Sequence, residues 1–223
     1  MSKKLNKVMS GVDRHGKPYA YKLKSIVNTK MTEEFQEFID ELNSFQFIKD
    51  CGGLYKPENF SLVNQLRKQD SSSYSCVEQI NGDIYKLWDS NFGSITLYPK
   101  DNGVELFRLE IFNQGRGYGS KMLQLFNHIS CKLDIPMTLS PGVPGNKDEY
   151  MDNQDKRIEF YERNGFCKTD NHYLAPRMSN QCLIDQYYND EIELPTVDLT
   201  EIINSKEIEK FREMFPGLFG EAE

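Results

Sequence analysis

The residues best suited to chemistry form one glycine-rich stretch, Gln114-Gly115-Arg116-Gly117-Tyr118-Gly119. Three glycines in five residues let the backbone approach a ligand closely, because no Cβ stands in the way. Apolar residues then recur at helical spacing up to Leu133, so the stretch leads into a helix start, where amide N–H groups and the helix dipole attract anions. This combination predicts a phosphate cradle. A plain tight connection between strand and helix is the alternative, and the spacing fits neither the dinucleotide-binding nor the P-loop pattern.

A second stretch supports a family resemblance. Gln114 to Gly119 resembles the Gln/Arg-x-x-Gly-x-Gly/Ala signature of the GNAT superfamily of acyl-CoA-dependent N-acyltransferases. Downstream, Phe160-Tyr161-Glu162-Arg163-Asn164-Gly165-Phe166 is similar to the late Tyr-Glu-Lys-x-Gly-Phe motif of that family. The two motifs stand in the family's order, and the interval between them suits its helix-strand-helix. The resemblance covers residues 94–177, which is less than half of the chain.

The resemblance implies where acetyl-CoA would bind. The coenzyme pyrophosphate would lie on the amides of the cradle, with Arg116 adding charge. A backbone N–H of the preceding strand, near Leu109 to Ile111, would bond the thioester oxygen. Tyr161 would be the general acid that gives a proton to the departing thiolate. The expected coenzyme-binding residues are Leu109, Ile111, Gln114, Gly115, Arg116, Gly117, Tyr118, Gly119 and Ser120.

A base for the acceptor amine is expected on the strand before the cradle, which carries Glu105 and Glu110. Strand alternation would put these two carboxylates on opposite faces, so at most one could face the site, and Glu110 is favoured. The alternative for Glu110 is an exposed strand carboxylate, because a water chain or an already neutral amine can replace a base. For Tyr161 the alternative is a packing role at the end of a helix.

Turn residues and hydrophobic periodicity predict the elements that must position these groups. Helices are expected to begin at Thr32 and near Pro57, and two more to cover residues 117–132 and 152–164. The run from Tyr74 to Phe112, broken by Asn81-Gly82 and other turn residues, predicts an antiparallel meander. The expected strands cover residues 19–27, 74–80, 84–88, 95–98, 104–112, 136–139 and 166–174. The fold class is α/β (α+β), and the resemblance implies a GNAT-like mixed, mostly antiparallel sheet flanked by helices.

The composition is that of a globular protein whose two end segments carry opposite net charges. Of its 223 residues, 38% are hydrophobic and 27% charged, which suits one domain with a full core. Residues 1–30 hold eight Lys or Arg against one Asp, whereas residues 180–223 hold eleven Asp or Glu against three basic residues. We expect residues 1–179 to form the GNAT-like domain, with a basic N-terminal segment, and residues 180–223 an acidic, partly helical extension. The net charge of −7 disfavours nucleic acid as a partner.

Cysteine and histidine usage points to no metal site. The five cysteines and three histidines are scattered without ligand spacing, so we expect free, mostly buried thiols rather than disulfides. No run reaches the roughly 18 apolar residues of a membrane span, and the basic start is not followed by an apolar signal segment. We therefore expect a cytoplasmic protein without a membrane partner, as a monomer or homodimer.

Three function classes follow. The favoured one is an N-acyltransferase that moves an acetyl group from acetyl-CoA to a primary amine by direct transfer in a ternary complex, with Tyr161 and Glu110 as catalytic residues. The others are a coenzyme A-binding module without turnover and an interaction protein that uses its charged flanks. The sequence leaves the acceptor open among small amines, peptide or protein amines and aminoacyl-tRNA.

Overall fold

A computed structural model describes residues 3–12, 18–58, 60–66, 75–100, 103–141, 147–169 and 176–197 of the chain. This described part forms two β-sheets and five helices. The helices are α1 (Glu33–Ser44), α2 (Gln46–Asp50), α3 (Tyr118–Leu133), α4 (Lys147–Arg163) and α5 (Gln181–Tyr188). The strands are β1 (Lys3–Val12), β2 (Pro18–Thr29), β3 (Ser61–Leu66), β4 (Ser75–Gly82), β5 (Tyr85–Asp89), β6 (Gly93–Lys100), β7 (Gly103–Ile111), β8 (Met137–Leu139), β9 (Cys167–Lys168) and β10 (Met178–Ser179).

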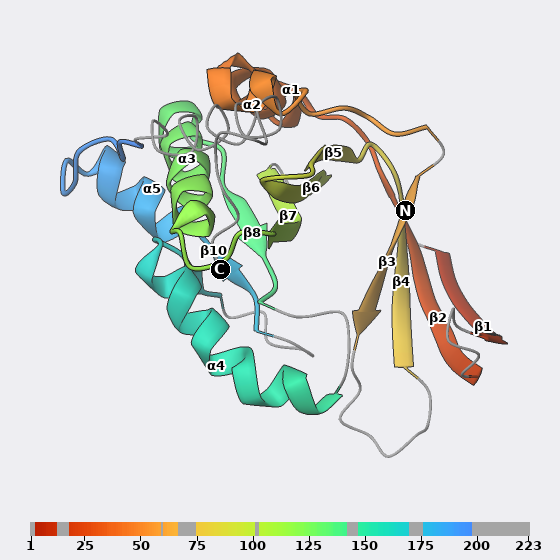
Figure 1. Ribbon diagram of the computed structural model, residues 1–223. Coiled ribbons are helices and arrows are strands. Elements are labelled where there is room, and N and C mark those ends of the chain that lie inside the picture. The colour runs from red at the N-terminus through yellow and green to blue at the C-terminus, as the bar shows by residue number, and fades with distance from the viewer. Residues whose placement is uncertain are drawn as a thin grey trace, which may run out of the picture.

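The larger sheet has six strands in the order β5-β6-β7-β8-β10-β9. Every neighbouring pair is antiparallel except β7 and β8, which run parallel and are joined through α3. Figure 1 shows α3, α4 and α5 on one side of this sheet and the four-stranded sheet β1-β2-β4-β3 on the other. The predicted fold class, a mixed and mostly antiparallel sheet flanked by helices, is confirmed.

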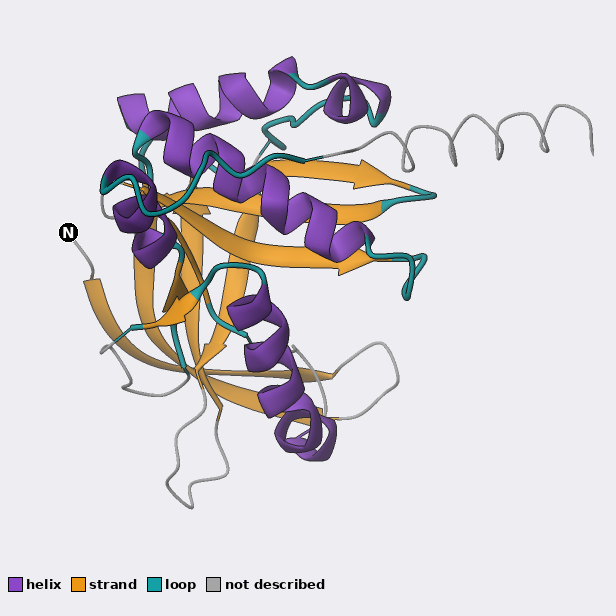
Figure 2. Ribbon diagram, turned by 90° about the vertical axis from the view of Figure 1, so that its left-hand side faces the viewer, coloured by secondary structure: helices purple, strands orange, loops and turns teal. Residues whose placement is uncertain are grey.

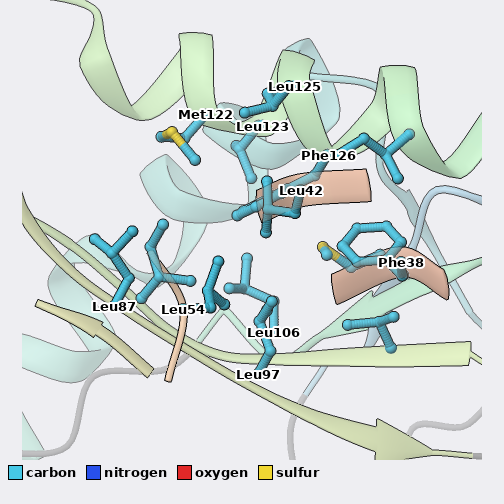
Figure 3. Packing of buried hydrophobic residues seen from close by; sticks show 14 of the residues in the cluster. Phe38, Leu42, Leu54, Leu87, Leu97, Leu106, Met122, Leu123, Leu125 and Phe126 are labelled. Atoms are coloured by element: carbon cyan, nitrogen blue, oxygen red, sulfur yellow. The ribbon is translucent and has the colours of Figure 1, made fainter. Parts of the chain in front are cut away.

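The main core lies between the six-stranded sheet and the helices. The apolar stripe of α1 and that of α3 meet the inward side chains of β5, β6 and β7, and Figure 3 shows Phe38, Leu42, Leu97, Leu106 and Phe126 in this layer. All five are at most 4% exposed, and fully burying a side chain of this size stabilises the fold by about 1.5–3 kcal/mol. Figure 2 shows the same layers after a quarter turn. This core fixes where α3 begins, and hence where the cradle lies.

One residue of β7 interrupts the regular pairing with β6. Leu97 pairs with Leu106, but the next residue back along β6, Thr96, pairs with Arg108, so Phe107 is an extra residue on β7. Such a bulge shifts the alternation of side chains by one position. Leu106 before the bulge and Leu109 after it therefore both face the helix-side core.

Three expectations about residues 1–82 are wrong. The segment after Pro57 forms strand β3 rather than a helix, because Leu62 pairs with Ile80 of β4 and both are buried. Asn81-Gly82 is not a hairpin turn between neighbouring strands, since β4 pairs with β2 and β3 and not with β5. The basic N-terminal segment supplies a β-hairpin of β1 and β2, where a single strand over 19–27 was expected.

Two of the five cysteines contradict the expectation of free thiols. Cys167 on β9 and Cys182 on α5 form a disulfide, with their Cα atoms 6.5 Å apart. Cys51 and Cys131 are buried and lie outside this disulfide, as expected. The disulfide ties α5 to the segment that follows α4, across 15 residues of sequence.

The start of the acidic region is packed onto the rest of the fold. Asn180 is fully buried; its side chain accepts a hydrogen bond from Met137 N at 2.7 Å and donates one to Asn127 Oδ1 at 3.1 Å. Ile184 of α5 is 1% exposed, and His128 Nδ1 of α3 lies 2.7 Å from the carbonyl oxygen of Pro195. Residues 198–223 lie outside the described part, so the division at residue 180 stays a prediction. Among the described helices, none has both the length and the apolar character needed to cross a bilayer.

Candidate active site

The cradle lies where β7 ends and α3 begins. Gln114, Gly115, Arg116 and Gly117 are exposed, and Gly115 and Gly117 adopt left-handed backbone with φ of 81° and 74°. A Cβ built on either of these glycines would meet no atom within 4 Å, so both face open space. This left-handed conformation explains why glycine occupies both positions, because a residue with a Cβ is destabilised there by about 1–2 kcal/mol.

The start of α3, at the cradle, has no side-chain cap. Its N-cap residue is Gly117, which has no side chain to make a capping hydrogen bond, and the first turn contains no acidic residue. Since the first intrahelical bond runs from Lys121 N to Gly117 O, the amides of Gly119 and Ser120 have no partner within the helix. By contrast, α1 starts with Thr32 capping Phe35 N and with Glu33 and Glu34 in its first turn. The start of α3 is therefore suited to an external anion.

Gly119 has a different role from the other two glycines. It is partly buried within α3, and a Cβ there would lie 3.3 Å from Phe160 Cζ and 3.7 Å from Ile111 Cγ1. The missing side chain makes room for Phe160 of α4 against the start of α3 and the end of β7. The two sequence motifs, which lie more than 40 residues apart, are thus brought together by this packing. Tyr118 beside it is buried in the core.

The end of β7 offers backbone amides on its open side. β8 pairs with β7 only from Val104 to Leu106, so the two strands stop pairing before the cradle is reached. Phe112 N donates to Phe92 O on the β6 side at 3.0 Å. Because successive N–H groups of a strand point to opposite sides, those of Leu109 and Ile111 point away from β6, toward the open edge. These are the two residues predicted to bond the thioester oxygen.

Tyr161 lies on the last turns of α4, packed against aromatic neighbours. Its ring centroid is 5.3 Å from that of Phe160 and 6.0 Å from that of Phe166, and the residue packs on the main core. Burial raises the pKa of the Tyr161 phenol, while the charge of Arg157 acts in the opposite direction. The phenol therefore keeps its proton at neutral pH, as a general acid must. Both the catalytic role and the packing role predicted for Tyr161 are compatible with this position.

Arg157 was not among the predicted site residues. It lies four positions before Tyr161, on the same face of α4. Its Nη1 atom is buried and makes no hydrogen bond within the described residues. An unpaired buried guanidinium nitrogen is costly and suits an anionic partner. The one signal in the sequence is a charged residue at i−4 from the motif tyrosine, which is too common a pattern to single it out.

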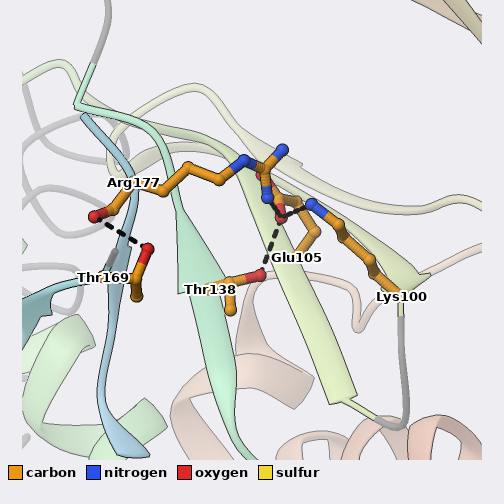
Figure 4. Close-up of polar contacts among 5 residues, drawn as sticks. All are labelled: Lys100, Glu105, Thr138, Thr169 and Arg177. Atoms are coloured by element: carbon orange, nitrogen blue, oxygen red, sulfur yellow. Dashed lines mark hydrogen bonds and ion pairs between the residues drawn. The ribbon is translucent and has the colours of Figure 1, made fainter. Parts of the chain in front are cut away.

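Glu105 has a structural role, since its carboxylate links neighbouring segments of the sheet. Its carboxylate is almost fully buried, and Oε2 accepts bonds from Lys100 Nζ at 3.1 Å, Thr138 Oγ1 at 2.7 Å and Arg177 Nη1 at 3.1 Å. Figure 4 shows how the three donors come from β6, β8 and the segment before β10. Arg177 O in turn accepts a bond from Thr169 N at 2.9 Å. Because the Glu105 side chain is only 4% exposed and Oε2 already accepts three bonds, an acceptor amine cannot reach it, and Glu105 is not a candidate base.

Glu110 is half exposed, one strand position before Ile111. Its Oε2 lies 3.7 Å from Arg108 Nη1 and 3.3 Å from Ser94 Oγ. The expectation that Glu105 and Glu110 lie on opposite faces is wrong, because the extra Phe107 shifts the alternation between them. Both carboxylates face away from the helix-side core, and Glu110 is the one that remains accessible.

Comparisons with known proteins gave distant likenesses in structure. No protein-family model matches the sequence, and no curated protein matches it either. The anti-CRISPR protein AcrVA5 is 20% identical over 43% of this chain and 96% of that chain, with a TM-score of 0.35. A protein assigned to the GNAT acetyltransferases, from Bacteroides thetaiotaomicron, is 18% identical over 60% and 69% of the two chains, with a TM-score of 0.32. The PaiA N-acetyltransferase from Thermoplasma acidophilum, solved with coenzyme A, is 22% identical over 43% and 58%, with a TM-score of 0.30. Likenesses at this level assign no activity to the chain.

Proposed function

We propose that this chain is an N-acyltransferase that moves an acetyl group from acetyl-CoA to a primary amine by direct transfer in a ternary complex. The cradle, Gln114 to Ser120, holds the coenzyme pyrophosphate through its backbone amides. The N–H groups of Leu109 and Ile111 face the thioester oxygen from the open edge of β7. Tyr161 is the general acid, and Glu110 takes the proton of the amine.

The observation that carries this proposal is the meeting of three groups at one end of the six-stranded sheet. The uncapped start of α3, the unpaired edge of β7 and the end of α4 are in contact through Gly119, Ile111 and Phe160. Each supplies a different need of acyl transfer: an anion site, donors for a developing oxyanion and a proton for sulfur. The residues therefore fit coenzyme A, and the open space at Gly115 and Gly117 leaves room for its phosphates.

The proposed chemistry balances with the groups of this chain. The bound thioester supplies an activated acyl carbon, to which the amine nitrogen forms a bond while the bond from carbon to sulfur breaks. Glu110 accepts one proton from the amine. Tyr161 gives its proton to the leaving sulfur and recovers one from solvent afterwards. The amides of Leu109 and Ile111 stabilise the negative oxygen during the exchange.

A ligand-dependent melting experiment tests the coenzyme site. Coenzyme A or acetyl-CoA at 100 times its dissociation constant should stabilise the fold by about 2.7 kcal/mol, seen as a rise in Tm. Gly117→Asn should abolish this rise, because a side chain would fill the cradle, while asparagine tolerates the left-handed backbone. Gly52→Asn is the matched control, since Gly52 has a φ of 89° and equally open surroundings at the end of α2. It should leave the rise intact. No rise in the wild type with any acyl-CoA would exclude this function.

Two other functions would give different results. A coenzyme A-binding module would show the rise in Tm but release no free thiol with any amine. An interaction protein that uses its charged flanks would show neither. Thiol release from acetyl-CoA in the presence of an amine panel therefore separates the acyltransferase from both.

A further inference from the structure

The face of the six-stranded sheet that is turned away from the helices carries an unassigned group of side chains beside Glu110. Trp88, Ser94 and Glu110 stand directly opposite one another on β5, β6 and β7. Lys86, Thr96 and Arg108 form the neighbouring row on the same three strands. Their inward neighbours Leu87, Ile95 and Leu109 belong to the helix-side core, so both rows face outward. We call these six residues the outer rows.

The outer rows combine exposed side chains with small buried ones. Trp88 is 57% exposed, and the side chains of Glu110 and Arg108 are 52% and 48% exposed. Ser94 and Thr96 between them are small and almost fully buried. Since neighbouring strands lie about 4.8 Å apart, the indole and the carboxylate stand roughly 10 Å apart, with Ser94 between them. A small molecule of this length can contact both exposed side chains.

The charges of the outer rows are complementary to a zwitterion. Glu110 offers one carboxylate, and Arg108 offers a guanidinium 3.7 Å from it. Lys86 adds a second cation nearby, held 4.2 Å above the ring of Phe60, and burial together with the charge of Arg108 lowers its pKa. Two cations beside one carboxylate would repel a polyamine. They suit an amine whose own carboxylate lies within a few ångströms of it.

We propose that the outer rows bind a free α-amino acid with an apolar or aromatic side chain. Its ammonium group pairs with Glu110, its carboxylate with Arg108, and its side chain lies against the indole of Trp88. One consequence of this inference rests on the proposed function: Glu110 deprotonates the α-amine, and the product is an N-acetyl amino acid. The binding site itself stands on the outer rows alone.

Fluorescence of Trp88 tests the site directly, because it is the only tryptophan of the chain. Titration of the protein with L-phenylalanine, under tryptophan-selective excitation and without coenzyme, should give a saturable change in emission. Phenethylamine lacks the carboxylate and N-acetyl-L-phenylalanine lacks the charged amine, so each should bind at least 10-fold more weakly. Equal affinity for phenethylamine, or no saturation with L-phenylalanine and L-leucine, would overturn the proposal.

Arg108→Gln provides the variant test. It should weaken L-phenylalanine binding at least 10-fold and leave phenethylamine binding unchanged, which a general loss of folding would not do. Lys49→Gln on α2 is the control, since it removes one exposed positive charge that does not belong to the outer rows and should change neither affinity. If coenzyme A raises Tm while no amino acid binds, the acyltransferase survives and this inference fails. If amino acids bind and no acyl-CoA does, the proposed function fails and the amino-acid site stands.

Discussion

Tyr161 combines a packing contact with a proton that the proposed reaction needs. Tyr161→Phe keeps the ring between Phe160 and Phe166 and removes only the hydroxyl. We expect acyl-CoA affinity and Tm to change little, while turnover with a working amine falls by about 10²–10⁴-fold, the usual cost of losing an acid-base group. Steady-state kinetics and melting curves check both parts. Unchanged turnover would assign Tyr161 a packing role only.

Cys131 allows a prediction about pH. Burial raises the pKa of its thiol to about 11. A group whose pKa is raised by folding stabilises the native state below its unfolded pKa, near 9, and this contribution is lost as pH rises through the folded value. The stability of the wild type should therefore fall between pH 9 and pH 11, and that of Cys131→Ala should fall less over the same window. Denaturant unfolding at both pH values measures this difference, and equal losses would contradict it.

At the scale of elements, the disulfide between β9 and α5 makes stability depend on redox conditions. A cross-link that closes a loop of about 15 residues is worth about 3 kcal/mol in the chain-entropy account. A reducing agent should lower the free energy of unfolding of the wild type by an amount of this order, and Cys167→Ser/Cys182→Ser should be insensitive to it. Denaturant titrations with and without reductant provide the measurement. A wild type that does not respond would show that the bond adds no stability.

The elements that the sequence predicts are those with strong local signals. α3 follows from glycines and a helical stripe, α1 from its Thr32 cap, and β5 to β7 from turn residues between apolar runs. β3 was mistaken for a helix because Phe60, Val63 and Leu66 fit helical spacing, whereas pairing of Leu62 with Ile80 decides the outcome. The Asn81-Gly82 turn was recognisable, but which strands flank it depends on distant β2.

The features of the candidate site also divide into those with a local sequence signal and those without one. The cradle glycines and Tyr161 are visible as motifs, since each is needed for backbone conformation or chemistry at a fixed spacing. The bulge at Phe107 is not visible, because every residue around it suits a regular strand. The disulfide is hidden as well, since the packing of α5 on α3 brings Cys182 to Cys167 and the sequence spacing carries no trace of it.

At the scale of the molecule, the two sheets share a small second core. Leu62 and Ile80 from the four-stranded sheet meet Ile84 and Tyr98, and Phe107 packs against them. The described part of the chain thus forms one body in which even the start of the acidic region is buried, through Asn180 and Ile184. The boundary for a functional truncation is accordingly best tested after Val197.

Removing residues 198–223 should leave folding and coenzyme A binding intact, because the contacts of α5 and of Pro195 with α3 remain. A chain that ends at Ser179 should lose several degrees of Tm, since it leaves Met137 N and Asn127 without their partner Asn180. Melting curves of the two truncated chains, each with and without coenzyme A, make the comparison. Loss of binding in a folded chain ending at Val197 would place part of the coenzyme site in the acidic region.

The extra residue at Phe107 decides how β7 would respond to a change in chain length. Phe107 and Arg108 both lie opposite Thr96, so deleting residue 107 would leave an unbroken ladder with β6 in which Arg108 to Ile111 keep their partners and their sides. The deletion and Phe107→Ala would both remove the same aromatic ring from the second core. We therefore expect the two changes to lower the free energy of unfolding by similar amounts, which denaturant titrations can measure. A much larger loss for the deletion would show that the bulge itself stabilises the sheet.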